Sequence, residues 1–473
     1  MKECVAVAPD QELQERLAAS SPLQGRENTI RSERASNAWK VLFILFLANL
    51  VNFFDRTIPA IMKEPIRHEW HLSDLQLGMI TAAFTVIYAI SGVPLGLMAD
   101  NGSRRKIIAW GLIFWSVFTA AGAGAWNFMS FLGTRLLVGL GEASFAPASN
   151  SIIGDLFPAE KRSRALGIFM LGLPMGLMLA FFSVGAMVTY FGSWRAPFFI
   201  AMFPGLIIAG LVLRIKEPER GAAEKAQTYK TKASFSNPVR KVLTIPTMRW
   251  LIVAGLAGNF AVYAVNSFIV SLLVRYFHMA LPLAAASAGV MVGVTGLAGL
   301  IGGGWVADKA HKRSKRGRLM LGAVAVALSA VLTWLALRLS ASQTGLFVAI
   351  FSIAWLLQYF YYICVYPAIQ DVVEPRLRAT AMAVFFAAMY IFGGAFGSVV
   401  VGKLSDVYTL GAMRAEGAVA ISAAHAAMGL HGAFILVPIA LAITALAIFK
   451  ATLTFPADAQ LMTASMETTA AVG

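Results

Sequence analysis

The sequence predicts an all-α integral membrane protein whose twelve transmembrane helices form two pseudo-symmetric bundles of six. Three observations lead to this fold class: the composition, the number and length of the apolar segments, and a charged turn that occurs twice. Hydrophobic residues make up 58% of the 473 residues and charged residues 13%, and the mean hydropathy is +0.70. A soluble protein cannot wet its surface with so few charges, so the chain is a membrane protein.

The apolar segments are each about 20 residues long, which is enough to span a hydrocarbon core of about 30 Å. They start near Lys40, Gln76, Ile107, Phe128, Ala165 and Trp194 and then, after a polar stretch, near Met248, Pro282, Leu319, Thr344, Thr380 and His431. We therefore expect a disordered tail over residues 1–39, a bundle over 40–215, a linker over 216–245, a second bundle over 246–452 and a second tail over 453–473. The first tail lacks the apolar segment of a signal peptide.

The distribution of lysine and arginine predicts the orientation of the helices. If the N-terminus lies inside the cell, 30 of the 39 basic residues fall on the cytoplasmic side, as the positive-inside rule requires. We therefore expect a multi-pass protein of the cell membrane with both termini in the cytoplasm. The net charge of +15 does not indicate a nucleic-acid partner, because the basic residues lie in short turns rather than on one exposed stripe.

A short charged turn follows the second helix of each predicted bundle. Its residues are Gly96, Asp100, Arg104 and Arg105 in the first copy, and Gly304, Asp308 and Lys309 in the second. Two further turns of similar composition, over residues 155–165 and 373–379, lead into the fifth and eleventh helices. Such duplication is typical of parallel-repeat transporters, whose two halves rock about a site held between them. We expect the first pair of turns to act as gates that hold the cytoplasmic ends together when the outside is open.

Four charged residues lie inside predicted helices, namely Asp55, Arg56, Arg135 and Glu142. Each would cost about 2.5 to 3.5 kcal/mol at a lipid-facing helix centre, so they are expected to face the interior of the bundle. Arg135 and Glu142 lie about 10 Å apart along one helix face, so each needs a partner from another helix. We expect Arg56 and Arg135 to be charge partners of Asp55 and Glu142, and these two carboxylates to carry a coupled proton. A static ion pair and direct substrate binding are the alternatives.

Polar and aromatic residues on other predicted helix faces are candidates for the substrate-binding cavity. They are Asn49, Asn52, Tyr88, Asn259, Tyr263, Asn266 and Tyr362. The aromatic run over 359–362 cannot face one way on a helix, so at most half of it lines a cavity. Glycines over 167–176 and 393–397 allow close helix packing and bending at matching places in the two halves.

The sequence lacks the residue patterns that other classes of function need. The six histidines form no metal-ligand spacing, and Cys4 and Cys364 imply no disulfide or metal site. No clustered nucleophile and base indicates an enzyme. We expect no cofactor, no metal, no catalytic residue and a monomeric protein. A transport-dead sensor or scaffold is an alternative, although such a protein would be expected to lose its buried charges.

The two turns, together with Arg135, Gly139 and Gly141, resemble the major facilitator superfamily. More narrowly, Asn52, Asp55 and Arg56, with the runs over 139–144 and 152–156, resemble the Spinster family. Two residues depart from the superfamily pattern, since Asn101 and Ser103 replace the usual basic residue and glycine. The resemblance implies the major facilitator fold and a proton-coupled or facilitative carrier of lysolipids, sphingolipid-like molecules or other amphiphiles. The expected partners are this substrate, protons and the lipid bilayer. A proton symporter of small organic or sugar acids is the alternative.

Overall fold

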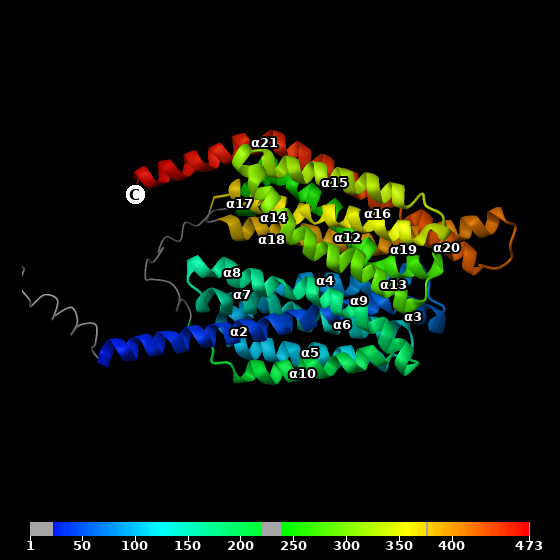
Figure 1. The fold of residues 1–473 in the computed structure, drawn as a ribbon, viewed down its shortest axis with the longest axis horizontal. Coiled ribbons are helices and arrows are strands. Elements are labelled where there is room, and N and C mark those ends of the chain that lie inside the picture. The colour runs from blue at the N-terminus through cyan, green and yellow to red at the C-terminus, as the bar shows by residue number, and fades with distance from the viewer. Residues whose placement is uncertain (1–21, 220–237, 375–376, 473) are drawn as a thin grey trace, which may run out of the picture.

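The computed structural model describes residues 22–219, 238–374 and 377–472, and these residues are folded into helices. Figure 1 shows two groups of helices, an N-terminal half from α2 to α10 and a C-terminal half from α12 to α21. We call the end where α2 begins and α21 ends the tail end of the molecule. The opposite end, which carries α3 and α20, is the far end.

The N-terminal half contains six spans, two of which are divided into two helices. Its helices are α2 (Pro22–Ile61), α3 (Lys63–Trp70), α4 (Asp74–Asn101), α5 (Arg104–Ala123), α6 (Phe128–Ala143), α7 (Phe145–Leu156), α8 (Ala159–Met170), α9 (Gly172–Phe191) and α10 (Ala196–Arg214). The short helix α11 (Pro238–Thr244) follows the linker.

The C-terminal half repeats this order. Its helices are α12 (Pro246–Arg275), α13 (Leu281–Ala288), η1 (Gly289–Val294), α14 (Thr295–Arg313), α15 (Gly317–Ala336), η2 (Ala341–Gln343), α16 (Thr344–Gln358), α17 (Phe360–Asp371), α18 (Arg378–Ala387), η4 (Ala388–Ala395), α19 (Phe396–Ala415), α20 (Ala423–Ala433) and α21 (Leu436–Val472). Segments η1 and η4 are π-helical and continue the spans in which they lie.

Within the described residues, eleven helical segments are long and apolar enough to cross a membrane. The twelfth span is α6 with α7. Helix α6 has 16 residues, and Ser144, which keeps helical backbone angles, joins it to α7. The predicted fold class is therefore confirmed.

The structure differs from the expected boundaries at both tails. Residues 22–39, expected to be disordered, belong to α2 because a helix started by the span propagates back through a stretch that has no proline between Pro22 and Pro59. Helix α21 likewise continues to Val472, beyond the expected end of the bundle at residue 452. The expectations for residues 1–21 and for residues 220–237 of the predicted linker over 216–245 lie outside the described residues, and the described end of that linker contains α11.

The two halves meet through equivalent spans. The second span packs against the eleventh, α4 on α19, and the fifth packs against the eighth, α9 on α13 and η1. Close approach depends on glycine, because a Cβ atom at Gly78 would lie 2.3 Å from the carbonyl oxygen of Ser398, and one at Gly402 would lie 2.2 Å from that of Asp74. Small residues at such contacts allow the van der Waals packing that drives helix association in lipid.

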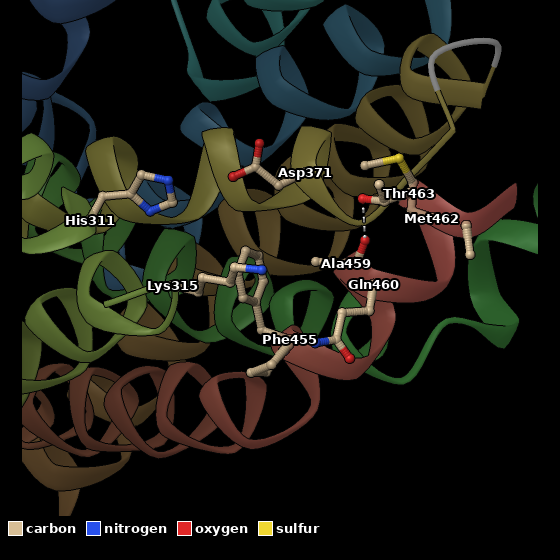
Figure 2. A pocket seen from close by; sticks show the side chains of 10 residues that line it. His311, Lys315, Asp371, Phe455, Ala459, Gln460, Met462 and Thr463 are labelled. Atoms are coloured by element: carbon tan, nitrogen blue, oxygen red, sulfur yellow. Dashed lines mark hydrogen bonds between the residues drawn. The ribbon is translucent and has the colours of Figure 1, made fainter. Parts of the chain in front are cut away.

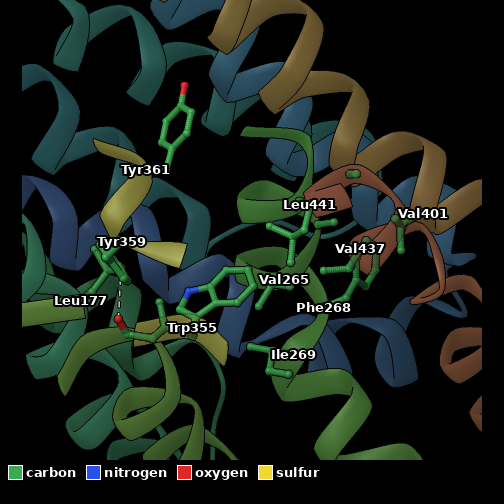
Figure 3. Close-up of a cluster of buried hydrophobic side chains, with 14 of the residues drawn as sticks. Leu177, Val265, Phe268, Ile269, Trp355, Tyr359, Tyr361, Val401, Val437 and Leu441 are labelled. Atoms are coloured by element: carbon green, nitrogen blue, oxygen red, sulfur yellow. Dashed lines mark hydrogen bonds between the residues drawn. The ribbon is translucent and has the colours of Figure 1, made fainter. Parts of the chain in front are cut away.

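The hydrophobic core shows at which end the halves are joined. One buried cluster unites the C-terminal half with the far-end part of the N-terminal half. In Figure 3, Leu177 of α9 lies in it with Val265 and Phe268 of α12 and with Trp355 of α16. A second cluster contains only N-terminal-half residues, from the tail-end parts of that half. The halves therefore share a core at the far end, whereas the tail-end core of the N-terminal half is separate.

Candidate functional site

The four charged residues predicted to face the interior lie together in the N-terminal half. Arg56 Nε donates to Glu142 Oε2 at 2.5 Å, which joins α2 to α6. The Glu142 side chain is fully buried, and that of Arg56 is 15% exposed. The guanidinium of Arg56 also lies 4.3 Å from the centre of the Tyr88 ring. Arg56 is thus held by a carboxylate on one side and by an aromatic face on the other.

The other two charges are packed more deeply and lack such a partner. Asp55 has no exposed surface, and neither of its carboxylate oxygens has a hydrogen-bond partner among the described groups. Its charged neighbours are Glu142 and Arg135. Arg135 donates a long hydrogen bond of 3.4 Å to the carbonyl oxygen of Phe118 and lies 5.3 Å from the centre of the Phe131 ring. The site therefore contains two acids and two bases, but one close ion pair.

Aromatic rings connect this charged site to the C-terminal half. Tyr88 of α4 contacts Tyr390 of η4 with ring centres 6.3 Å apart, and Tyr390 contacts Tyr263 of α12 at the same distance. A series of rings continues from Tyr390 through Phe386 and Tyr366 to Tyr362, with centres 5.6 to 6.1 Å apart at each step. The structure thus brings three of the predicted cavity residues, Tyr88, Tyr263 and Tyr362, onto one aromatic surface.

Two other predicted cavity residues form equivalent contacts between helices. The side-chain amide of Asn49 donates to the carbonyl oxygen of Phe169 at 2.8 Å, and that of Asn259 donates to Met389 at 2.8 Å. Both asparagines are buried. Each one ties the first helix of its half to the fifth, so both amide nitrogens are already engaged in holding the bundle together.

The remaining cavity candidates, Asn52 and Asn266, have polar atoms without a protein partner. In Asn52 this atom is the amide nitrogen, and in Asn266 it is the amide oxygen. Asn52 lies one helical turn before Arg56, and Asn266 one turn after Tyr263. Both therefore have hydrogen-bonding capacity left for a ligand.

The first charged turn is bound within the N-terminal half. Arg104 forms an ion pair with Asp155 at the end of α7 and contacts Glu217 at 3.3 Å. Glu217 also accepts hydrogen bonds from Ser103 Oγ at 2.5 Å and from the backbone of Arg104 at 2.9 Å. Burial raises the pKa of Glu217, but these hydrogen bonds outweigh burial and lower the pKa overall. Arg105 donates to the carbonyl oxygen of Ile215 at 3.0 Å.

The second copy of the turn is bound within the C-terminal half and more loosely. Arg318, at the start of α15, lies 3.5 Å from Asp371 and 3.7 Å from Asp308, whose side chain is 74% exposed. Lys309 lies over the ring of Trp305. Gly96 packs against Pro147, whereas Gly304 has no neighbour at its Cβ position. The side chain of Asp100 lies outside the described part of the structure.

Sequence reasoning missed a cluster of charges at the far end, which joins the two halves. It consists of Lys63, Glu64 and Arg67 of α3, Asp74 of α4, Arg275 of α12 and Asp406 of α19. We call it the far-end ion cluster. The sequence signal was the presence of both acidic and basic residues near the ends of α3, α4 and α12, together with an aspartate inside α19.

The cavity drawn in Figure 2 lies at the tail end of the C-terminal half. It has a volume of about 420 Å³ and lies between His311, Lys315 and Asp371 on one side and the end of α21 on the other. None of the residues predicted to bind substrate or proton lines it. Within the described residues, no group of three or more histidine, cysteine, aspartate or glutamate side chains is arranged to hold a metal ion.

Comparison with known proteins gives one family. The profile of the Major Facilitator Superfamily matches residues 45–398. An MFS-type efflux pump of Mycolicibacterium smegmatis is 29% identical over 376 residues, which cover 79% of this chain and 85% of that protein. Protein spinster homolog 1 of Xenopus tropicalis is 29% identical over 392 residues, which cover 77% of this chain and 72% of the relative.

A solved structure has the same fold. It is the crystal structure of a bacterial homolog to the human lysosomal transporter Spinster, in an inward-facing and unoccupied conformation. The TM-score is 0.78 at 27% sequence identity, and the match covers 89% of this chain and 98% of that chain. The predicted resemblance to the superfamily and to Spinster proteins is therefore confirmed.

Proposed function

Because this chain belongs to the major facilitator superfamily and is a membrane transporter of that fold, we propose that it is a proton-coupled secondary transporter of amphiphiles. It works by alternating access, with the cavity between the halves open to one side of the membrane at a time. No catalytic activity is part of this proposal. The observation that carries it is the contact of 2.5 Å between the buried carboxylate of Glu142 and Arg56, beside the unpartnered Asp55.

Proton coupling needs a carboxylate whose affinity for a proton changes as the protein changes conformation. Glu142 gains most of its charge stabilisation from Arg56 on another helix, so a small movement of α2 against α6 changes that stabilisation. Asp55 lies next to Glu142 and has no partner of its own. Two neighbouring carboxyl groups in a buried site titrate as a pair, and the pair with one bound proton is more stable than the pair with both groups ionised.

The proposed substrate is a lysolipid- or sphingolipid-like amphiphile. Arg56 offers a positive group to a phosphate or other anionic headgroup, and it is the most exposed of the four charges. The aromatic surface from Tyr88 to Tyr362 offers apolar area to a tail and ring faces to a cationic group. This arrangement suits an amphiphile better than a wholly polar solute.

We further propose that the tail end is cytoplasmic, as the distribution of basic residues indicates. The cores of the two halves are fused at the far end and separate at the tail end. With this orientation the conformation described here is open to the cytoplasm. The relative with the TM-score of 0.78 is likewise inward-facing.

The deciding experiment is uptake by the purified full-length protein in liposomes under an imposed pH gradient. The substrates are a series of lysolipids of increasing tail length, with a hexuronic acid as the short hydrophilic comparison. Each buried methylene adds about 0.8 kcal/mol, or roughly a fourfold gain in affinity, until the cavity is filled. A flat lysolipid series together with saturable uptake of the acid would replace the amphiphile by a sugar acid.

A further inference from the structure

The far-end ion cluster ties the two halves together through Arg275. Its guanidinium donates to both oxygens of Glu64 at 2.9 Å and to the two oxygens of Asp74 at 2.8 and 2.9 Å. Glu64 and Asp74 belong to the N-terminal half, whereas Arg275 ends the first helix of the C-terminal half. All three side chains are buried. One arginine therefore satisfies two carboxylates across the interface.

A second set of bonds crosses the interface in the opposite direction. Asp406 of α19 accepts hydrogen bonds of 2.9 Å from the backbone nitrogens of Asp74 and Leu75, and so caps the start of α4. Ser405 donates to the carboxylate of Asp74 at 2.6 Å. These contacts must all break for the far ends of the two halves to separate.

Lys63 is buried beside these pairs without an acceptor. Its side chain is 1% exposed, its ammonium nitrogen has no hydrogen-bond partner among the described groups, and it lies 3.9 Å from the centre of the Phe268 ring. The carboxylates that it faces, Glu64 of α3 and Asp74 of α4, are already bound to Arg275 of α12. The other charged groups of the cluster are Arg67 of α3 and Asp406 of α19.

We propose that the far-end ion cluster is the gate that closes the transport cavity on that side, and that Lys63 makes the gate open as the pH falls. The inference rests on the proposed function, since a gate is needed only if the halves alternate. It adds a proton-sensitive element that is separate from Glu142 and Asp55.

The direction of the pH response follows from the difference between the pKa of Lys63 in the closed gate and its pKa in the open gate. In the closed gate, burial first and the charge of Arg275 second lower the pKa of Lys63 from 10.5 to about 7, although Asp74 and Glu64 act in the opposite direction. In the open gate water reaches the ammonium group, and its pKa returns toward the ordinary value. The open form therefore binds the proton more tightly. Between pH 10 and pH 7, each unit of acidification raises the open-to-closed ratio by up to about tenfold, and the effect is complete below pH 7.

The test measures the distance between spin labels across the far end. Labels are placed on cysteines that replace Tyr190 of α9 and Val419 of the loop after α19, both of them exposed, in a full-length protein without Cys4 and Cys364. We expect the longer, open distance to gain population between pH 9 and pH 7 and to change little below pH 7. Arg275→Gln is expected to populate the open distance at every pH.

The Lys63→Met variant keeps the length of the side chain and removes its charge. We expect the closed distance to dominate and the response between pH 9 and pH 7 to disappear. Lys403→Met, which removes an exposed lysine at the same end of the molecule, is the matched control and should keep the response. A response in Lys63→Met equal to that of the parent protein, or none in the parent itself, would overturn the role of Lys63.

The proposed gate and the proposed coupling site can be disproved independently of each other. The response of the labels is expected to persist in Glu142→Gln, because that residue is not part of the far-end ion cluster. If Arg275→Gln leaves the distance distribution unchanged at all pH values, the cluster is not the gate. Loss of proton-driven uptake is read in liposomes without labels, so it reports on the proposed function alone.

Discussion

The two halves of this transporter have matching backbones but different charges at matching positions. Asn49 and Asn259 make the same hydrogen bond from the first helix of each half. Asp55 and Arg56 lie six and seven residues after Asn49, and the residues at the same offsets from Asn259 are Val265 and Asn266. Equivalent positions on the first helix of each half therefore hold charged residues in the N-terminal half and uncharged residues in the C-terminal half.

The fourth span of each half shows the same contrast. Asp155 and Asp371 are the acidic partners of Arg104 and Arg318 at the starts of α5 and α15. Glu142 lies thirteen residues before Asp155, and the residue thirteen before Asp371 is Gln358. Gln358 is buried, and both of its amide atoms lack a protein partner. A neutral polar site thus occupies the position that corresponds to the proposed coupling site.

This comparison suggests that the two halves have different roles. A buried charge is costly unless another helix supplies a counter-charge, and in the N-terminal half Arg56 of α2 supplies one to Glu142 of α6, so this half holds the proposed coupling site. The C-terminal half keeps the helix contacts and contributes most of the aromatic rings. Four experiments test this distinction.

The largest effect is expected from Glu142→Gln, which removes the titratable group and keeps its shape. A pH gradient of one unit drives about tenfold accumulation if one proton accompanies each substrate, because 1.36 kcal/mol corresponds to a factor of ten. In Glu142→Gln, and similarly in Asp55→Asn, accumulation should fall to the equilibrium level while exchange at equal concentrations survives. Gln358→Leu, at the corresponding position of the other half, should still accumulate substrate. Full proton-driven accumulation by Glu142→Gln would remove that residue from the coupling site.

Arg56→Gln tests the ion pair by leaving Glu142 buried without its counter-charge. Breaking a buried pair costs about 3 to 5 kcal/mol, whereas replacing both partners is often neutral. Thermal unfolding in detergent should therefore show a clear loss of stability in Arg56→Gln, most of which is recovered in the double variant with Glu142→Gln. An additive double variant would mean that the two side chains do not interact.

Gly176→Ala and Gly397→Ala test whether the close packing of the first and fifth spans is equivalent in the two halves. A Cβ atom would lie 2.3 Å from the carbonyl oxygen of Leu50 at the first position and 2.5 Å from that of Phe260 at the second. Such overpacking costs about 1 to 3 kcal/mol, and we expect similar losses of thermal stability in the two variants. Gly167→Ala, where nothing lies within 4 Å, is the control. A loss confined to one half would show that the close packing is not shared.

The smallest effect on stability is expected from Asp308→Asn. The carboxylate is mostly exposed and 3.7 Å from Arg318, so its contribution in this conformation is at most about 1 kcal/mol. Its proposed role is in the opposite conformation, where it would hold the tail ends together. Distances between labels on the tail-end loops of the two halves should shift toward the inward-open value, with Glu219→Gln as the control. No widening would argue against this role.

Sequence reasoning identified the residues of the charged site but not their arrangement. The spacing of Arg135 and Glu142 along one helix excluded a direct bond between them. The free-energy cost of an unpaired charge in the hydrocarbon core meant that each needed a partner from another helix. It could not decide which of Asp55 and Arg56 would meet Glu142, because they are neighbours on α2 and point in different directions. Similarly, Asn49 and Asn259 are polar residues in apolar helices, but only the packed bundle shows that they bind backbone carbonyls.

The far-end ion cluster and the two tail-end turns show the same limit. Most charges of the cluster lie at helix ends, and hydropathy shows that a residue at a helix end can leave the lipid but not which side chains it meets there. The turns were expected to hold the cytoplasmic ends together when the outside is open; in the conformation described here, the contacts of Arg104 and Arg318 stay within a half, so that role stays a prediction for the opposite conformation.

The sequence by itself determined the membrane-spanning character, the number of spans and the duplication, because apolar length and repeated turns are local properties of the chain. Only the tertiary structure decided which end is closed and which charges pair. Those features depend on contacts between helices that are distant in the sequence, such as Arg275 with Glu64 and Asp74, and the energy of a buried charge depends on its neighbours in space.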